Sequence, residues 1–273
     1  MTVIPEAQNK EVLAFDALAK RYDDLFAHSQ SGCAQREALL EILINTFRLG
    51  DHILELNSGT GEEALFLAMY LDVSVVACDA SERTIQAAQL RMQAAAPDVS
   101  VQFEVLPTER LSKLHPSAIF DGALLNFSGL NSVADLNRTA RELASLVAIG
   151  APVLICLSTR FCLSETLWFL VHGKFRRAFR RSAGIATVKV GGEVAKVNYP
   201  TLREVKKLFS PSFLMRCCTS IGVVVPPSYL ERHFRKYPRV LWLLRLIDRR
   251  ISRIQSLQTI GDHMLLCFER VEG

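Results

Sequence analysis

The sequence predicts an α/β fold built on a doubly wound parallel sheet. Three observations predict it: apolar runs of strand length alternate with helical segments, these runs are apolar almost without interruption, and one of them passes through a glycine-rich turn into a helix. Strands of a parallel sheet are covered on both faces, so they lack the polar alternation of half-exposed strands. A chain of 273 residues suffices for one such domain with an elaboration.

The strands are expected where apolar runs are bounded by turn residues, in chain order at 53–55, 73–79, 99–106, 118–126, 153–158, 213–225 and 263–270. Helices are expected where apolar residues recur at intervals of three or four, at 8–27, 35–47, from 62, and at 81–96, 132–147, 160–182, 201–209 and 228–256. Ser81 is a plausible N-cap, and Ser132 with Asp135 resembles a capping box. A hairpin is expected at 188–194 about Gly191 and Gly192.

The chain divides into four parts on this reading. Residues 1–48 form two amino-terminal lid helices, and 49–159 form the nucleoside-binding core. Residues 160–200 form an α/β insert of helix and hairpin after the fifth strand, near the acceptor site, and 201–273 complete the sheet. The insert is an elaboration rather than a separable domain, and it follows the strand end where ligands of open sheets bind.

Composition argues against several classes of protein. The net charge of +4 is too mild to imply nucleic acid, and no apolar run reaches the 18 residues of a membrane span. Met1 to Lys10 is polar and lacks the apolar region of a signal peptide. The seven cysteines are scattered without C-x-x-C or a histidine at zinc spacing, so we expect a cytoplasmic protein without a metal.

The glycine-rich turn predicts a nucleoside site. Glu55 ends the first strand, Gly59 and Gly61 permit a tight turn and close approach of a ligand, and the next helix presents unpaired N–H groups. Asp79 ends the second strand, where a carboxylate can accept hydrogen bonds from ribose hydroxyls. The spacing Gly59-x-Gly61-x-x-Ala64 also fits a dinucleotide fingerprint, but Glu55 would repel a pyrophosphate, whereas it suits the ammonium group of S-adenosylmethionine (SAM).

The run from Glu55 to Gly61 resembles motif I of the class I SAM-dependent methyltransferases, E/D-x-G-x-G-x-G, and the order of elements resembles their whole fold. Asn57 replaces the first glycine; asparagine is the residue after glycine that best tolerates left-handed backbone angles. The resemblance implies a Rossmann-like sheet of seven strands whose last strand runs antiparallel. It also implies that the helix at 8–27, which carries Tyr22, covers the cofactor as a lid, with Ser31-Gly32 as a hinge.

The resemblance further implies a set of cofactor-binding positions. Glu55 and Gly59 lie beside the methionine part of SAM, Asp79 holds the ribose, and Leu106 and Pro107 pack at the adenine. The full set expected to bind the cofactor is Glu55, Asn57, Gly59, Gly61, Asp79, Ala80, Leu106, Pro107 and Asn126.

Three residues are candidates for catalysis: Tyr22, Asn126 and His263. Asn126 ends the fourth strand at the family's substrate-facing motif IV. His263 follows Asp262 at the start of the last strand and is the best candidate for a general base, although a histidine that caps a strand is equally compatible with the pattern. Tyr22 would contact the methyl group or pack the lid.

Methyl transfer from SAM to a small-molecule acceptor is the favoured function, because residues 126–129 match neither the N-P-P-Y nor the D-P-P-Y signature of enzymes that methylate amino groups of nucleic acids and proteins. Three alternatives stay open: an enzyme that uses SAM without methylating, such as a cyclase or lyase acting on SAM; an NAD-dependent oxidoreductase; and a non-catalytic SAM-binding module.

Two basic zones stand out, at 174–181 and 232–253. Each is either a solvated helix face or a contact for an acidic acceptor, a carrier protein or an anionic membrane surface. We expect no nucleic-acid partner, and the oligomeric state does not follow from the sequence.

Overall fold

The computed structural model describes residues 29–114, 118–127, 129–190 and 193–273. Its main feature is a seven-stranded sheet in the order β3-β2-β1-β4-β5-β9-β8. The first five strands along the chain pair in parallel, and β9 runs antiparallel to both β5 and β8, which confirms the predicted sheet. The strands are β1 His52–Leu56, β2 Ser74–Asp79, β3 Val101–Val105, β4 Gly122–Leu125, β5 Pro152–Ser158, β8 Phe213–Ile221 and β9 His263–Arg270.

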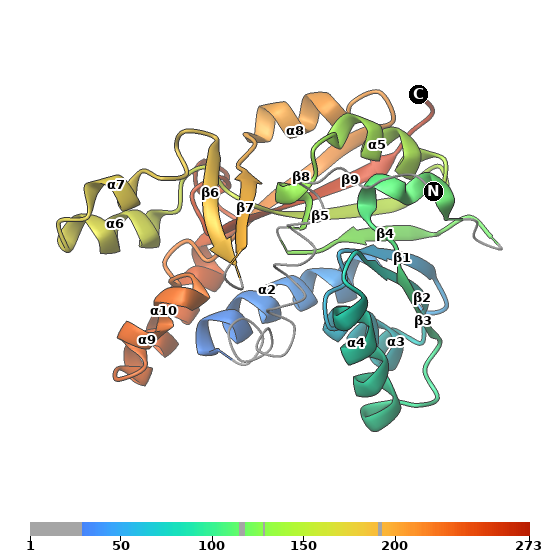
Figure 1. Cartoon of the computed structure of the whole chain (residues 1–273), viewed down its shortest axis with the longest axis horizontal. Coiled ribbons are helices and arrows are strands. Elements are labelled where there is room, and N and C mark those ends of the chain that lie inside the picture. Colours follow the sequence, from blue (N-terminus) through green and yellow to red (C-terminus); the bar gives the residue numbers. More distant parts are fainter. Residues whose placement is uncertain (1–28, 115–117, 128, 191–192) are drawn as a thin grey trace.

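Helices cover both faces of this sheet (Figure 1). On one face lie α5 and α8, whose apolar side chains form a buried cluster with Leu54 and Leu56 of β1. On the other lie α2 and α3, which pack against Ile53. The helices are α2 Gln30–Thr46, α3 Glu62–Leu71, α4 Glu82–Ala95, α5 Leu136–Ala144, α8 Leu202–Phe209 and α10 Pro238–Ile251.

The side chains of β1 alternate between these two layers, as the pleat of a strand requires. Leu54 and Leu56 point to the α5 and α8 side, and Ile53 points to the α2 and α3 side. Glu55 lies two residues after Ile53 and therefore points to the same side of the sheet, toward α2 and α3. Its side chain is fully buried. A carboxylate is thus placed inside the apolar layer.

Helix α2 belongs to this core and is not part of a lid. Leu39, Leu43 and Phe47 are buried against the sheet in the cluster that contains Ile53. The prediction that residues 1–48 form lid helices is therefore wrong for α2, because its apolar stripe is needed to cover the sheet. The helix predicted at 8–27, with Tyr22, lies outside the described residues.

The insert after β5 consists of two short helices, α6 Leu163–Val171 and α7 Phe175–Ala178, and a hairpin of β6 Ile185–Val190 and β7 Glu193–Asn198. The hairpin pairs Val190 with Glu193 across the predicted glycine turn, which confirms the prediction. The single helix expected at 160–182 is broken at Gly173, which has a φ of 69°. Further on, η4 Ser228–Leu230 and α9 Glu231–Phe234 lead into α10, and η5 Gln255–Leu257 follows it.

Two element ends differ from prediction for local reasons. Ser132 lies in the short helix η3 Gly129–Ser132, and the N-cap of α5 is Asp135, whose side chain accepts from the backbone N–H of Arg138 at 2.9 Å. Strand β8 stops at Ile221 rather than 225, because Gly222 has a φ of 71° and donates its N–H to the Asp248 carboxylate of α10.

Gly61 gives a test of the turn that follows β1. It has a φ of 74°, and a Cβ at this position would lie 2.7 Å from the Phe103 ring. Gly61→Ala should lower the free energy of unfolding by about 1–2 kcal/mol for the left-handed backbone and by a further ~1–3 kcal/mol for the clash.

Gly50→Ala is the matched control for this measurement. Gly50 has a φ of 80°, and a Cβ there would meet nothing within 4 Å. Thermal and denaturant unfolding should show the smaller loss in Gly50→Ala. Equal losses in the two variants would mean that Phe103 yields and that packing does not demand glycine at position 61.

Candidate functional site

The turn between β1 and α3 is held in left-handed backbone angles at three positions: Asn57 with φ 58°, Gly59 with φ 55° and Gly61 with φ 74°. The prediction that Asn57 takes a glycine-like conformation is confirmed. Its side chain is also used: Oδ1 accepts from the Thr108 hydroxyl at 3.3 Å, and a Cβ on Gly129 would lie 2.3 Å from the Asn57 side chain. Asn57 thus joins the turn to the segments that follow β3 and β4.

Asp79, at the end of β2, holds the same turn from the other side. One carboxylate oxygen accepts from the Gly59 N–H at 3.0 Å and the other from the Ser81 N–H at 2.9 Å. Ser81 in turn caps α4 through the Thr84 N–H, which confirms the predicted N-cap. The Asp79 carboxylate is therefore fixed in place beside the glycine loop, where its role toward ribose hydroxyls stays a prediction.

The predicted adenine positions lie next to Asp79. The Leu106 N–H donates to the Asp79 carbonyl at 2.9 Å, and Pro107 precedes the short helix η2 Thr108–Lys113. Leu106, Pro107 and Ala80 are all half-buried. They lie at the carboxyl ends of β2 and β3, the edge at which ligands of open α/β sheets bind.

A buried polar bridge joins β1, β4 and α3. The side-chain amide of Asn126 donates to Glu55 Oε1 at 3.1 Å and to Glu63 Oε2 at 2.9 Å, while its own oxygen accepts from the Phe127 N–H at 2.7 Å. Asn126, Glu55 and Glu63 are all buried. Every polar atom of the Asn126 amide is engaged, so the structure gives it a positioning role; its contact with a substrate stays a prediction.

Burial and the neighbouring Glu63 raise the pKa of Glu55 well above its ordinary value of 4.5. Glu63 is compensated by Arg36 of α2, whose Nε lies 2.6 Å from Glu63 Oε1. Glu55 Oε2 is buried and accepts no hydrogen bond within the described chain. A buried polar atom without a partner is costly unless a ligand supplies one, and the ammonium group of SAM can donate to Glu55 in its carboxylate form.

The candidate base His263 lies at the start of β9, opposite Ser158 at the end of β5. Its ring packs edge-on against Phe127, with 5.2 Å between ring centroids, and its Nδ1 lies 3.6 Å from Asp262 Oδ2. Burial is the main cause that lowers the pKa of His263 below 6.5, and the charge of Arg181 acts in the same direction. The structure therefore brings His263 next to the residue that follows Asn126, with its ring neutral at pH 7.

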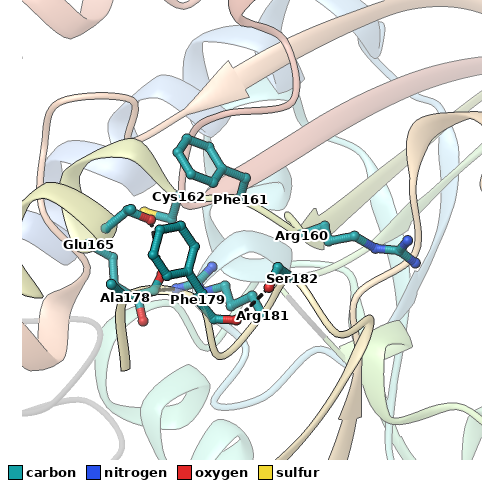
Figure 2. A pocket seen from close by; sticks show the side chains of 9 residues that line it. Arg160, Phe161, Cys162, Glu165, Ala178, Phe179, Arg181 and Ser182 are labelled. Atoms are coloured by element: carbon teal, nitrogen blue, oxygen red, sulfur yellow. Dashed lines mark hydrogen bonds and ion pairs between the residues drawn. The ribbon is translucent and has the colours of Figure 1, made fainter. Parts of the chain in front are cut away.

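A buried ionic cluster ties the insert to this edge of the sheet. Arg181 is 6% exposed; it donates to Asp262 Oδ1 at 2.8 Å and pairs closely with Glu165 of α6, while Arg180 lies 2.7 Å from the same Glu165. Figure 2 shows Arg181, Glu165 and Cys162 grouped together, with Arg160 pointing away from them. The basic zone at 174–181 is therefore not one solvated face, because Arg181 compensates two buried carboxylates.

Cys162, Glu165 and Asp262 also bring potential ligand atoms within 4.8 Å of one another. Both carboxylates are already paired with Arg181, and the pKa of the Cys162 thiol is raised by burial to about 12. A metal ligand must be a thiolate, and a cation here would compete with the guanidinium. We therefore assign this cluster a structural role rather than metal binding.

The hairpin of the insert is anchored by a residue that the sequence did not single out. Asn131 is fully buried; its Nδ2 donates to the Asn198 carbonyl at 2.5 Å and the Ser158 carbonyl at 3.3 Å. The sequence did not single out Glu63 and Glu165 either, and it grouped Arg181 with the other bases of 174–181. Nothing in a run of like charges distinguishes the buried Arg181 from the exposed Arg176 and Arg177.

Comparison with known proteins decides which nucleoside this site serves. A family model described as "Methyltransferase domain" matches residues 53–150, the segment that contains the glycine loop, Asp79 and Asn126. Residues 53–150 therefore match a methyltransferase domain, and the seven-stranded sheet has the class I SAM-dependent methyltransferase fold. The cofactor of this chain is SAM rather than the dinucleotide that the glycine spacing left open.

Solved structures support the fold. The chain matches an S-adenosylmethionine-dependent methyltransferase from Mesorhizobium loti with a TM-score of 0.55 and 16% identity, over 90% of this chain and 100% of that one. It matches geranyl diphosphate C-methyltransferase from Streptomyces coelicolor, a structure with S-adenosyl-L-homocysteine bound, with a TM-score of 0.55 and 12% identity, over 86% and 79%. The cyclase SpnF gives a TM-score of 0.57 and 13% identity, over 86% and 82%. At such identities these matches show the fold alone.

A curated relative, an uncharacterised protein of Methanocaldococcus jannaschii, is 26% identical over 189 residues. The match covers 67% of this chain and 66% of the relative, so the chain spans about two thirds of that protein.

Glu55 predicts that SAM binding releases a proton. Without ligand the raised pKa keeps Glu55 protonated above pH 4.5, whereas an adjacent ammonium favours the carboxylate. The bound state then holds fewer protons, so SAM affinity should rise with pH above the ordinary carboxyl value of 4.5, by at most about tenfold per pH unit. Calorimetry in buffers of different ionisation enthalpy measures the released proton.

Glu55→Gln copies the protonated side chain and should abolish both the proton release and the pH dependence. Glu41→Gln is the matched control, because Glu41 is an exposed acid on α2 that pairs with Arg249 and Arg253. If the Glu55→Gln variant still releases a proton on SAM binding, the proton comes from another group.

Asp79→Ala should weaken SAM by about tenfold or more, since charge-assisted hydrogen bonds contribute roughly 1.5–3 kcal/mol. Titration calorimetry gives the affinity, and circular dichroism checks folding. Asp121→Ala is the control: Asp121 also accepts a backbone N–H, from His52 at 2.9 Å, but at the opposite end of β1. Unchanged SAM affinity in a folded Asp79→Ala protein would refute the ribose assignment.

Proposed function

We propose that this protein transfers the methyl group of SAM to a small-molecule acceptor that binds beside His263. The observation that supports the proposal is the arrangement at the carboxyl ends of β4 and β5. A neutral histidine there packs against Phe127, one residue beyond Asn126. The insert is fastened to the same place through Arg181 and Asn131, so the acceptor side is built from side chains of this chain.

SAM, when bound, would supply an activated methyl group on its sulfonium: transfer would join the methyl carbon to the acceptor and release S-adenosylhomocysteine. The chain contributes orientation: Asp79 and the glycine loop fix one end of the site, and the bridge through Asn126 fixes β4 relative to β1. Positioning of the reactants can contribute about 7–11 kcal/mol to such a transfer. His263, held neutral by burial, can accept a proton from an acceptor hydroxyl or amine.

His263→Gln should lower kcat by about 100-fold or more if His263 is the base, with the Kd for SAM unchanged. Because burial lowers the pKa of His263 below 6.5, the wild-type rate should stay constant near pH 7 and fall only below pH 6.5, and the variant should lose this fall. The measurement is transfer of labelled methyl groups into a fractionated metabolite extract.

His52→Gln is the control for this experiment. His52 begins β1 at the opposite end of the sheet, where it stacks on Phe120. Equal activity in His263→Gln and His52→Gln would assign His263 to the structural role of a strand-start residue.

A second candidate function is a cyclase- or lyase-type reaction of SAM itself, without methyl transfer. The similarity to SpnF, a cyclase, supports this second candidate, because this fold is then not confined to methyl transfer. Products separate the two candidates. S-adenosylhomocysteine formed only with an acceptor supports methyl transfer, whereas methylthioadenosine from SAM alone supports a lyase-type reaction.

A further inference from the structure

One end of the molecule carries an exposed surface that is both apolar and basic. Figure 1 shows α6, α7, α9 and α10 gathered there, away from β1, β2 and β3. Helices α6 and α7 share a small apolar cluster with η4 and α9, around Phe169, Ala178 and Leu230. More than half of the exposed large apolar side chains of the described chain lie in residues 163–182 and 228–254. We call these two segments the helical end.

Helix α10 shows how this surface is formed. Leu241 and Asp248 are buried, and the helix packs on α2. Val240, Leu243 and Ile247, spaced at i, i+3 and i+7, form an apolar stripe that faces solvent. Trp242 is 62% exposed on the adjoining face. Such a stripe gains nothing from the fold of the chain and is suited to an external apolar phase.

The α6 and α7 part has the same character. Leu167 and Val171 of α6, one turn apart, are exposed, the latter at 83%. Phe175 and Phe179 are exposed as well. The aromatic ring of Trp168 packs against Phe234 of α9, which joins the two halves of the helical end.

The basic residues of the helical end fall into three groups. Arg180 and Arg181 pair with Glu165, and Arg245, Arg249 and Arg253, spaced by one turn, pair with Glu37 and Glu41 of α2. The members of the remaining group, called the second group below, are exposed and form no ion pair with any described carboxylate: Lys174, Arg176, Arg177, Arg232, Arg235, Lys236, Arg239 and Arg250. Arg239 and Arg250 lie about three helical turns apart, hence on the same side of α10, next to the apolar stripe.

No acidic side chain of the helical end offsets this second group. Its acids are Glu165, Glu231 and Asp248. Glu165 and Asp248 are buried, and Glu231 accepts a hydrogen bond from the Ser31 N–H. The exposed surface of these segments is therefore positive throughout, while the chain as a whole carries only +4.

We propose that the helical end docks on an anionic lipid bilayer as an interfacial, non-spanning contact. Exposed tryptophan, phenylalanine and leucine with uncompensated arginine and lysine is the combination that binds the headgroup boundary of such membranes. Nucleic acid would use the arginines but offers nothing to the aliphatic stripe of Val240, Leu243 and Ile247. No helix in the described part of the chain is long and apolar enough to cross a bilayer, in keeping with a surface contact.

The test is binding to vesicles of phosphatidylcholine with about one third phosphatidylglycerol, at low salt and without SAM, so that its outcome is independent of the proposed function. We expect sedimentation with these vesicles, weak sedimentation with pure phosphatidylcholine, and loss of binding as salt screens the charges. The Trp168→Phe variant leaves Trp242 as the single tryptophan. When this variant binds the anionic vesicles, the fluorescence emission of Trp242 should shift to the blue, and brominated lipids should quench it.

Two variants locate the contact. Arg239→Glu with Arg250→Glu should weaken binding to the anionic vesicles by about tenfold or more, since each base near the surface contributes about 1 kcal/mol. Lys206→Glu with Lys207→Glu on α8 makes the same change in net charge on an exposed helix of the main sheet and should leave binding unchanged. Trp242→Ser with Leu243→Ser should weaken binding, and Leu49→Ser with Tyr70→Ser, also exposed, should not.

The proposal is overturned if the protein does not bind anionic vesicles at low salt, or if brominated lipids do not quench the fluorescence of Trp242. It is also overturned if the Lys206 and Lys207 control weakens binding as much as the Arg239 and Arg250 variant, because net charge alone would then explain it. Binding to a double-stranded DNA oligonucleotide without binding to vesicles would assign the surface to nucleic acid instead.

Discussion

The Asn126 amide, held between the carboxyl groups of Glu55 and Glu63, is the contact on which the site depends. It joins β1, β4 and α3, the three elements that surround the point where the strand order reverses and where open α/β sheets bind their ligands. Two carboxyl groups in an apolar layer repel each other when both are charged. A shared amide donor, together with the raised pKa of Glu55, lets both remain buried.

The same groups serve stability and binding, which explains why α2 is a core helix. Arg36 of α2 compensates Glu63, while Leu39 and Leu43 of α2 cover the sheet around Ile53. The glycine loop is held in a comparable way, by Asp79 from β2 and by Asn57 from within the turn. The cofactor edge is thus preorganised by contacts of the protein with itself, and one acceptor atom, Glu55 Oε2, is left without a donor in the described chain.

A second buried centre, Arg181 with Glu165 and Asp262, connects the insert to the first residues of β9. Breaking one partner of a buried ion pair is more costly than losing an exposed pair, because the remaining charge is uncompensated. Through Asp262 this centre lies beside His263, so α6 and α7 are fastened at the carboxyl end of β5. The helical end and the candidate acceptor site therefore belong to one connected part of the molecule.

The sequence by itself determined the sheet, the hairpin of the insert and the glycine loop, because apolar periodicity and left-handed turn residues act locally; Asn57 could be read as a substitute for glycine from its own backbone preference. The N-cap of α5 was misjudged by one turn, since Ser132 and Asp135 are both good caps. Only the tertiary structure decided that Glu63 meets Glu55, that Arg181 is buried while Arg176 and Arg177 are exposed, and that α2 is core. Those outcomes depend on contacts between residues far apart in the chain, and a run of like charges does not specify which member will find a buried partner.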